Sequence, residues 1–479
     1  MVGRGGATRL RREQRIGIVG GGPAGIHLAH LLKHRGFAQV TVLERNARPG
    51  GKVQSVLHDG TWFEMGACYI PPNYDLYRSL LARYRCGTIV SPPKLVRDVF
   101  SSSGGGGLRR HDFDSWIATV TDRLIAAGKL RPGGQARRLL NVLGAVRRLR
   151  AERRRLLGSS AYPHAERPTA AALRDLAAPF GELIDRCRLH VLEPFFSLAT
   201  SAQGYGVIET SPSFYPLLWN EDAFVTAFVL NRLGLSRRPF LATVDTGVQA
   251  LFPEMAKQDG LDVRAEHEVV GIERPAGRPV AVTVRHGGTT KEMQFDQVVL
   301  AGDLKASLRT LAAPTEEERD IFPRFVHSTF VTTLIETPRW PTGAFAFNVE
   351  DTLIPNPSFT VSGVRERRFL TAERNEGSAA AVAYQFRQDQ NGPAVDADLD
   401  LCFTPEMRAL GFEDMTVIQR SSWAYCPRFP ADGVAEGLPW QIFAMQGTNN
   451  TWYAGSSAAF ESINDVMKYN ELLLRYYAD

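Results

Sequence analysis

Apolar and polar positions near the start of the chain predict a strand, a helix and a second strand. The apolar run at 16–19 gives way to a glycine-rich stretch at 20–25. Apolar residues then recur at helical spacing over 26–32, which predicts a helix with one buried face. A second apolar run at 40–43 predicts the next strand, which ends on Glu44.

The rest of the chain divides into a helical part and parts richer in strands. Residues 110–235 show helical periodicity, and residues 325–440 mix helix and strand patterns. The Gly287-Gly288 pair predicts the turn of a hairpin. Strands are predicted at 269–272, 280–285, 295–301, 330–336, 379–386 and 416–423, and a last helix from about 464.

The stretch between the first strand and the first helix carries the residues of a dinucleotide-binding turn. Gly20 allows a tight turn, Gly22 lets the backbone approach a pyrophosphate, and Gly25 lets the helix pack close to the strand. Free N–H groups and the helix dipole favour an anion at this helix N-terminus. Glu44 follows Gly25 by 19 residues, close to the usual ~20 for a ribose-binding carboxylate. The predicted dinucleotide contacts are Gly20, Gly22, Pro23, Ala24, Gly25 and Glu44.

Later segments resemble the flavoprotein amine oxidase superfamily. Glu44-Arg45 leads into a Gly-Gly-Lys turn at 50–52, and Glu64-Met65-Gly66-Ala67 follows a short polar hairpin. Tyr453-Ala454-Gly455 is similar to the last strand and final flavin-contacting turn of that superfamily. The resemblance implies tightly bound, non-covalent FAD. The further contacts that it implies are Arg45, Gly51, Lys52, Met65, Gly66, Ala67, Val269, Gly455, Ser462 and Ile463.

Within that superfamily the chain resembles the bacterial FAD-dependent polyenoic fatty acid isomerases. Between the matching segments the similarity is thin, and fungal flavoprotein dehydrogenases of alkaloid pathways have a similar layout. The resemblance therefore implies the fold and the cofactor and leaves the substrate open. The matching segments, in order, are 43–52, 63–67, 93–97, 204–206 with Pro212 and Tyr215, 247–252, 445–447 and 453–455.

This resemblance implies an α/β (α+β) fold in which two domains are interleaved. A Rossmann-like FAD-binding domain of the amine oxidase/GR2 type is expected over 14–70, 240–310 and 440–479. A substrate-binding domain, part helical (about 110–235) and part mixed sheet, is expected over 71–239 and 311–439. Residues 1–13 are basic and rich in glycine, lack the apolar core of a signal peptide, and are predicted to be a disordered lead-in.

Composition narrows the functional classes. Hydrophobic residues make up 44% of the chain and charged residues 22%, as in soluble globular proteins. Five dispersed cysteines without metal spacing indicate reduced thiols and a cytoplasmic location. The formal net charge is only +5, and no nucleic-acid partner or metal site is expected. The histidines at 27, 30 and 34 are predicted to lie on the surface of the first helix.

An arginine-rich segment at 137–157 predicts a basic amphipathic helix. Three interpretations are open: the helix is solvated and packs by one face, it attracts acidic amphiphiles or rests transiently on anionic lipid, or it binds nucleic acid. The third has no support from a recognisable nucleic-acid module. The sequence leaves the oligomeric state undetermined. The apolar stripe is expected to comprise Leu139, Leu140, Leu143, Val146, Leu149 and Leu157.

Arg97 is the candidate for recognising the substrate. In the isomerases that the chain resembles, an arginine in the matching segment holds the fatty-acid carboxylate at a tunnel mouth. A guanidinium can bind a carboxylate through two parallel hydrogen bonds. The alternative is a surface arginine paired with Asp98. Aromatic residues that include Phe196 and Tyr205 are candidates for lining an apolar tunnel, and they fit a protein core equally well.

Two departures from the amine oxidases bear on the chemistry. Those enzymes often carry a lysine that aids flavin reoxidation, but the matching stretch at 327–331 contains none. Cys426 lies near the position at which monoamine oxidases attach their flavin, whereas the isomerase pattern has an aromatic residue there. Non-covalent FAD is therefore expected.

Three functions follow as hypotheses. The first is hydride transfer to flavin N5 from an apolar, carboxylate-bearing lipid or secondary metabolite, with double-bond isomerisation or desaturation. The second is an amine or alkaloid oxidase or dehydrogenase of secondary metabolism, and the third a non-catalytic flavin-binding protein. No catalytic side chain is assigned, because the flavin supplies the reactive atom.

Overall fold

The computed structural model describes most of the chain. Its described residues are 9–90, 97–102, 108–158, 164–236, 240–338, 346–349, 368–374, 379–390, 403–404, 407–408, 412 and 414–478.

A five-stranded parallel sheet forms the centre of the first domain. Its strand order is β19-β13-β1-β2-β9. On one side of β1 lies β2, followed by β9. The later strand β13 pairs with the other side of β1. This reversal makes β1 and β13 a topological switch point, so a crevice for a ligand is expected beyond their carboxyl ends. The strands are β1 (Ile16–Val19), β2 (Val40–Leu43), β9 (Asp262–Arg264), β13 (Gln297–Leu300) and β19 (Thr451–Tyr453).

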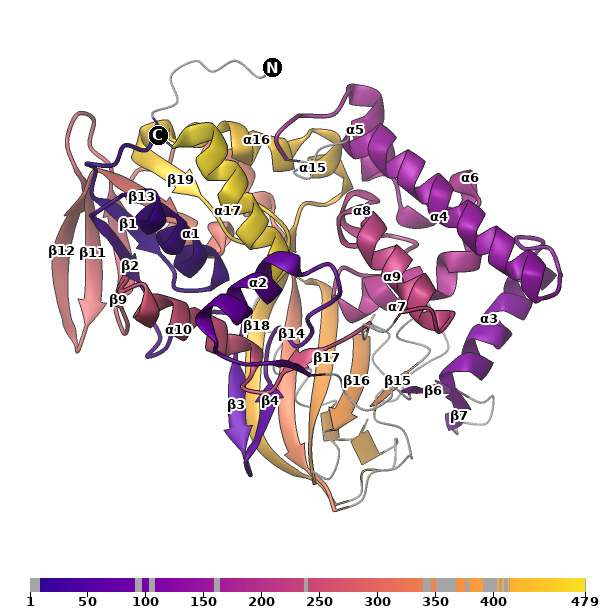
Figure 1. Ribbon diagram of the computed structural model, residues 1–479. Helices are drawn as coiled ribbons and strands as arrows, with labels where there is room; N and C mark the ends of the chain where they lie inside the picture. Colours follow the sequence, from indigo (N-terminus) through magenta and orange to yellow (C-terminus); the bar gives the residue numbers. More distant parts are fainter. Residues whose placement is uncertain are drawn as a thin grey trace.

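Helices cover one face of this sheet and a second, antiparallel sheet covers the other (Figure 1). On the helical face, α1 (Pro23–His34) packs against α17 (Ile463–Tyr477). On the other face, a Cβ on Gly17 would lie 2.7 Å from the ring of Phe295. Only glycine fits between β1 and this second sheet. Its strands are β10 (Glu268–Glu273), β11 (Val280–His286) and β12 (Thr289–Phe295).

The hairpin at Gly287-Gly288 is present, but one predicted strand is divided. Residues 289–295 pair with β11, and β13 begins only at Gln297. The prediction of one strand over 295–301 is therefore wrong. Phe295 belongs to the antiparallel sheet, and the four buried residues after Asp296 belong to the parallel one.

A seven-stranded sheet dominates the second domain, below the parallel sheet in Figure 1. Its order is β18-β14-β17-β16-β15-β6-β7. Two further small sheets are β3-β4, a hairpin within the first segment assigned to FAD, and β5-β8, which pairs a strand of the substrate segment with one of the second FAD segment. The bounds are β3 (Ser55–His58), β4 (Thr61–Glu64), β5 (Ile89–Val90), β6 (Arg97–Ser102), β7 (Leu108–Asp112), β8 (Thr243–Val244), β14 (Val326–Glu336), β15 (Ala346–Val349), β16 (Arg368–Arg374), β17 (Ala380–Gln390) and β18 (Thr416–Arg428).

Helices α3 to α9 lie in the part of the chain predicted to be helical. Among the described residues, no helix is long and apolar enough to span a lipid bilayer. The other helices whose bounds the described part of the chain gives are α2 (Asp75–Tyr84), α3 (Phe113–Ala126), α4 (Gln135–Leu157), α5 (Ala170–Ala177), α6 (Phe180–Cys187), α7 (Glu193–Ala202), α8 (Phe214–Trp219), α9 (Asp222–Arg232), α10 (Leu251–Gln258), α11 (Leu304–Ser307), α12 (Glu316–Ile321), α15 (Ala431–Ala435) and α16 (Leu438–Ala444).

The predicted fold class is confirmed, because a Rossmann-like parallel sheet stands beside antiparallel sheets. All five parallel strands fall within the segments assigned to FAD, and the domain boundaries themselves stay predictions.

The lead-in is shorter than predicted. Leu10 is buried and its N–H donates to Tyr477 O at 2.8 Å, so residues 9–13 are ordered, and 1–8 lie outside the described residues.

The apolar stripe predicted for the arginine-rich helix is two faces rather than one. Leu149 and Leu157 are buried, whereas Leu139, Leu140 and Leu143 are exposed. At 100° per residue, Leu149 points away from Leu140 and Leu143 around α4, whereas the buried Leu157 lies in line with Leu139, about five turns further along the helix.

Candidate functional site

The turn after β1 is shaped to hold an anion. Gly20 has a φ of +110°, which favours glycine, and a Cβ on Gly25 would lie 1.9 Å from Gly20 O. Pro23 occupies the first turn of α1, and no side chain caps the helix N-terminus. The free N–H groups of this turn therefore remain for a phosphate.

The Gly50-Gly51 turn lies directly against this phosphate turn. A Cβ on Gly51 would come within 3.1 Å of the Cα of Gly22, and Gly50 N donates to Gly21 O at 2.9 Å. Both Gly50 and Gly51 have positive φ. The two glycine turns therefore lie in contact at the place where the resemblance implies that the diphosphate of FAD binds.

Glu44 lies at the end of β2 with its carboxylate buried. It accepts hydrogen bonds from Gly21 N at 2.7 Å and from Asn46 N at 2.8 Å. An ionised carboxylate has about four acceptor positions, so two remain for ribose hydroxyls. His267 N donates to Glu44 O at 2.8 Å, which brings the start of β10, and Val269 within it, close to this end of the site.

The segment Met65-Gly66-Ala67 packs on the Gly-Gly-Lys turn. A Cβ on Gly66 would lie only 2.0 Å from Lys52 O, and Ala67 N donates to the same oxygen at 3.1 Å. The indole N–H of Trp423 and the hydroxyl of Thr332 both donate to Met65 O, at 2.8 and 2.9 Å. This segment therefore connects the nucleotide turns to the seven-stranded sheet.

The C-terminal segment closes the site. Gly455 follows β19 with a φ of +89°, and a Cβ there would lie 2.9 Å from Ala301 O. The Nζ of Lys52 lies 2.6 Å from Glu461 Oε2. Ser462 caps α17 by accepting from Asp465 N at 3.2 Å, so Ile463 is the first residue of that helix.

These residues fit FAD. The close approach of Gly22 and Gly51, the uncapped α1 N-terminus and the carboxylate of Glu44 match a diphosphate and a ribose. The remaining predicted contacts converge on the same turns, with the exposed Arg45 next to Glu44. That each of them touches FAD stays a prediction.

An acid–histidine pair lies at the carboxyl end of β13. Asp303 caps α11 by accepting from Ala306 N at 2.8 Å, and its other oxygen is hydrogen-bonded to His327 Nε2. Burial acts to raise the pKa of Asp303, but the hydrogen bond and charge of His327 more than offset this, so that pKa lies below its usual range. His327 stands in the stretch where the amine oxidases often carry a lysine.

The predicted aromatic residues lie in two environments. Tyr205 stacks between Tyr215 and Phe460, with centroid distances of 5.3 and 4.8 Å, and its hydroxyl accepts from Glu461 N. It therefore touches the C-terminal segment of the site. Phe196 is fully buried in α7 against Phe180, within the main core. Their roles in binding substrate stay predictions.

Arg97 begins β6 and pairs in register with Ala346, and its side chain lies outside the described residues. Asp98, the alternative partner of Arg97, forms an ion pair with Arg110 at 2.9 Å. Val99 is buried in one apolar cluster with Met65 and Phe330. The strand that carries Arg97 thus shares an apolar cluster with Met65, one of the predicted flavin contacts.

The prediction of surface histidines on α1 is wrong for two of the three. His27 and His30 are 1% and 4% exposed, because α10 and α17 cover the flanks of α1. His30 Nδ1 lies 2.6 Å from Asp259 Oδ2, and the exposed His34 also contacts Asp259. These direct hydrogen bonds, with the guanidinium of Arg83 at 3.5 Å from His34, join side chains of α1, α2 and the end of α10 into one polar cluster.

The sequence did not predict three residues of the site: Glu461, Asp303 and His327. None of them belongs to a motif of fixed spacing, and each contacts a residue from another segment of the chain, Lys52 with Glu461 and Asp303 with His327. No periodicity or motif spacing could have paired them. The Gly-Gly-Lys turn and the final strand were recognisable only because each has a local pattern.

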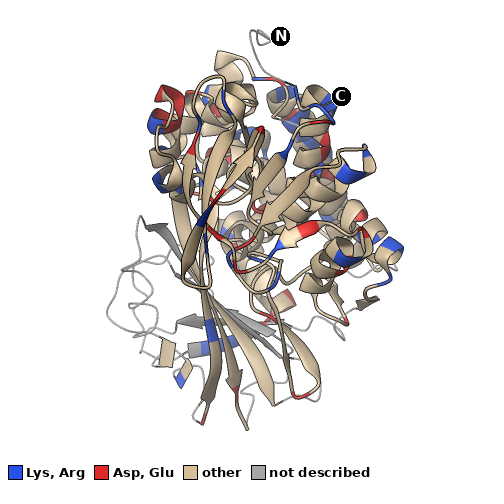
Figure 2. Cartoon of the chain, turned by 90° about the vertical axis from the view of Figure 1, so that its left-hand side faces the viewer, with Lys and Arg blue, Asp and Glu red and all other residues tan. Residues whose placement is uncertain are grey.

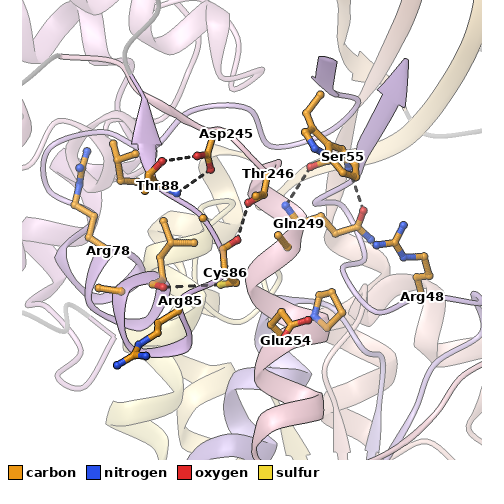
Figure 3. A pocket seen from close by; sticks show the side chains of 17 residues that line it. Arg48, Ser55, Arg78, Arg85, Cys86, Thr88, Asp245, Thr246, Gln249 and Glu254 are labelled. Carbon is orange, nitrogen blue, oxygen red and sulfur yellow. Dashed lines mark hydrogen bonds between the residues drawn. The ribbon is translucent and has the colours of Figure 1, made fainter. Parts of the chain in front are cut away.

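An open groove of about 1080 Å³ lies between α2, α10 and the β3-β4 hairpin (Figure 3). Thr88 with Asp245 and Ser55 with Gln249 form hydrogen bonds across its wall. The guanidinium groups of its arginines point in different directions in Figure 3 and do not converge on one point. This groove offers no second binding site of defined charge.

Comparison with known proteins agrees with this geometry. A polyenoic fatty acid isomerase from Ptilota filicina is 21% identical over 97% of this chain and 95% of its own. A crystal structure of a CLA-producing fatty acid isomerase from P. acnes covers 98% of this chain and 99% of its own, with a TM-score of 0.74 and 22% identity. Cyclohexylamine oxidase from Brevibacterium oxydans covers 97% and 99%, with a TM-score of 0.59 and 15% identity.

These structural likenesses show the fold. Residues 23–358, well over half of the chain, match the family of flavin-containing amine oxidoreductases. The chain therefore belongs to the flavin-containing amine oxidoreductase family.

Proposed function

We propose that this protein is an FAD-dependent enzyme that moves or introduces a double bond in an apolar, carboxylate-bearing lipid or secondary metabolite. When bound, FAD would supply the hydride acceptor, its N5 atom. The similarity to two fatty acid isomerases over nearly the whole of each chain supports this proposal.

The main structural support for the proposed function is the apolar environment of Met65. Phe330 stacks on Phe386 with a centroid distance of 4.3 Å and lies 4.9 Å from Tyr425. Burial raises the pKa of Tyr425 well above its usual range, so its phenol stays neutral. A site walled by such groups would exclude water and protect a cationic intermediate on the substrate.

The proposed place for the substrate carboxylate is Arg97. The apolar cluster of Val99, Phe330 and Met65 leads from that strand toward the flavin-facing segment. Because Asp98 is already paired with Arg110, the acid next to Arg97 has a partner of its own. A guanidinium at one end and an apolar path toward Met65 would orient a fatty acid in one direction.

An amine or alkaloid oxidase is the second candidate, favoured by the structural likeness to cyclohexylamine oxidase. Against it, the stretch from His327 to Val331 lacks the lysine that aids reoxidation in many amine oxidases, and His327 is held by Asp303. A non-catalytic flavin-binding role is the third candidate.

The test uses the purified flavoprotein with polyunsaturated fatty acids and with amines. Diene absorbance, oxygen consumption and peroxide are followed together. The proposal predicts a product with shifted or added double bonds from a fatty acid, and no peroxide in the isomerising case. Stoichiometric peroxide with an amine would establish the second candidate instead. A flavin spectrum that no substrate changes would favour the third.

A further inference from the structure

Helix α4 lies at the edge of the molecule and has two apolar faces (Figure 1). Ala145, Leu149 and Leu156 are at most 1% exposed and form the inner face. On the outer face, Leu139, Leu140 and Leu143 are 38%, 69% and 53% exposed. The outer leucines are therefore not required to pack α4 onto the protein.

Several arginines of α4 are bound to neighbouring elements. Arg148 donates to Cys187 O at 2.8 Å, and Arg153 donates to Leu217 O at 3.0 Å. Arg150 pairs with Asp222 at 2.8 Å, and Arg155 pairs with Asp175 and Glu152. These arginines fix the helix in place, which explains part of its basic composition.

Other arginines of α4 share the outer face with the leucines. Arg147 is seven residues after Leu140 and four after Leu143, and Arg154 is seven further on, so all four lie on one side of the helix. Arg147 and Arg154 are exposed and have no ion-pair or hydrogen-bond partner among the described residues. The outer face is thus apolar at one end and cationic toward the other.

Helix α9 extends this apolar area. Arg153 contacts Leu217 and Arg150 contacts Asp222, so residue numbers rise along this segment as they fall along α4. The segment therefore runs antiparallel to α4, and the C-terminal end of α9 lies toward the outer leucines. Leu230, Leu233 and Leu235 are 38%, 44% and 70% exposed. We call the outer leucines of α4 together with these three residues the leucine face.

We propose that the leucine face docks on an anionic lipid surface. Exposed leucines beside unpaired arginines match the apolar and charged layers of such an interface. A symmetric contact between two copies would place positive charge on both sides of the interface and is disfavoured by the repulsion between them. The side of the molecule away from α4 carries both signs of charge intermixed (Figure 2). This attachment does not depend on the identity of the substrate.

Vesicle flotation with the full flavoprotein tests the proposal. We expect binding to phosphatidylcholine vesicles that contain phosphatidylglycerol and little binding to pure phosphatidylcholine. Leu140→Gln with Leu143→Gln should weaken binding about tenfold or more, since each leucine loses its apolar contact. Arg147→Gln with Arg154→Gln should weaken it about fivefold for each charge removed, and added salt should act in the same direction.

Matched controls carry the same changes elsewhere. Leu57→Gln, at a residue 56% exposed on β3, and Arg35→Gln, at a half-buried residue after α1, should leave binding unchanged. The proposal is overturned if the wild-type protein binds both vesicles equally or neither, or if the leucine variants bind like wild type. A dimer in light scattering that the leucine variants abolish would also overturn it.

Discussion

Lys52 Nζ lies 2.6 Å from Glu461 Oε2, and this pair joins two turns that are 409 residues apart in the chain. Lys52 ends the Gly-Gly-Lys turn, and Glu461 directly precedes the cap of α17. The Glu461 carboxylate also accepts from Cys426 N at 3.0 Å. One acid therefore holds together the first nucleotide segment, the last one and the end of β18.

Removing the charge of Glu461 should weaken this junction. Glu461→Gln keeps an acceptor for Cys426 N but loses the ion pair, and we expect a loss of about 1–2 kcal/mol in the free energy of unfolding, since the pair is partly buried. Denaturant unfolding of Glu461→Gln, Lys52→Met and the double variant measures the coupling. Additive losses would show that the two charges do not interact.

Gly66→Ala should abolish flavin uptake. The added methyl group would lie 2.0 Å from Lys52 O, so the two turns must separate. The flavin-to-protein ratio of the purified variant is the measurement. Gly134→Ala is the control, because a Cβ there meets nothing within 4 Å and Gly134 lies at the start of α4, outside the nucleotide turns. Full flavin content in Gly66→Ala would disprove the close packing of these turns.

Glu64 should give the protein a pH-dependent stability. Burial raises the pKa of its carboxyl from 4.5 to about 8, against hydrogen bonds from Ser55 and Val248 N. The unfolded chain ionises near pH 4.5 while the folded protein keeps the proton. The contribution of Glu64 to the free energy of unfolding is therefore fully present below pH 4.5. It is lost as the pH rises toward 8, and the loss is on the order of a few kcal/mol.

Thermal unfolding over this pH range checks the expectation. Glu64→Gln, which cannot ionise, should flatten the profile between pH 5 and 8, and Glu317→Gln at an exposed position should leave it unchanged. Parallel profiles for all three proteins would mean that Glu64 does not hold its proton.

Arg97→Ala should weaken binding of a carboxylate substrate by about 2–4 kcal/mol, the usual effect of removing one partner of a buried charge pair. Flavin content should not change, because β6 lies outside the nucleotide turns. Arg97→Lys should restore binding only in part, since lysine keeps the charge and loses the two parallel hydrogen bonds. Unaltered substrate affinity in Arg97→Ala would remove Arg97 from the site.

Acid precipitation should release the yellow colour into the supernatant. Cys426 is buried, its Sγ donates to Gln203 O at 2.9 Å, and burial raises its pKa well above the usual range, so it is a poor nucleophile. Flavin absorbance in the two fractions decides the matter. Colour retained in the pellet, and lost from it in Cys426→Ser, would establish a covalent bond.

Local patterns made part of this structure predictable. The glycines of the first turn, Glu44 and the Gly-Gly-Lys turn each follow from a short motif whose geometry has few solutions. The contacts between distant segments, such as Asp303 with His327, have no local signature. The burial of His27 could not be predicted from the sequence either. The helices that cover it come from residues 251–258 and 463–477, far from His27 in the chain.

The parallel sheet has a consequence for synthesis of the chain. Its edge strand β19 and the helix α17 that covers α1 are made only after residue 450, whereas β1 emerges first. At about 5–20 residues per second, the early strands wait tens of seconds for these partners. The nucleotide-binding domain can therefore close only after the ribosome has made residues 451–477, and a product that stops before them would expose an unfinished sheet to aggregation and proteolysis.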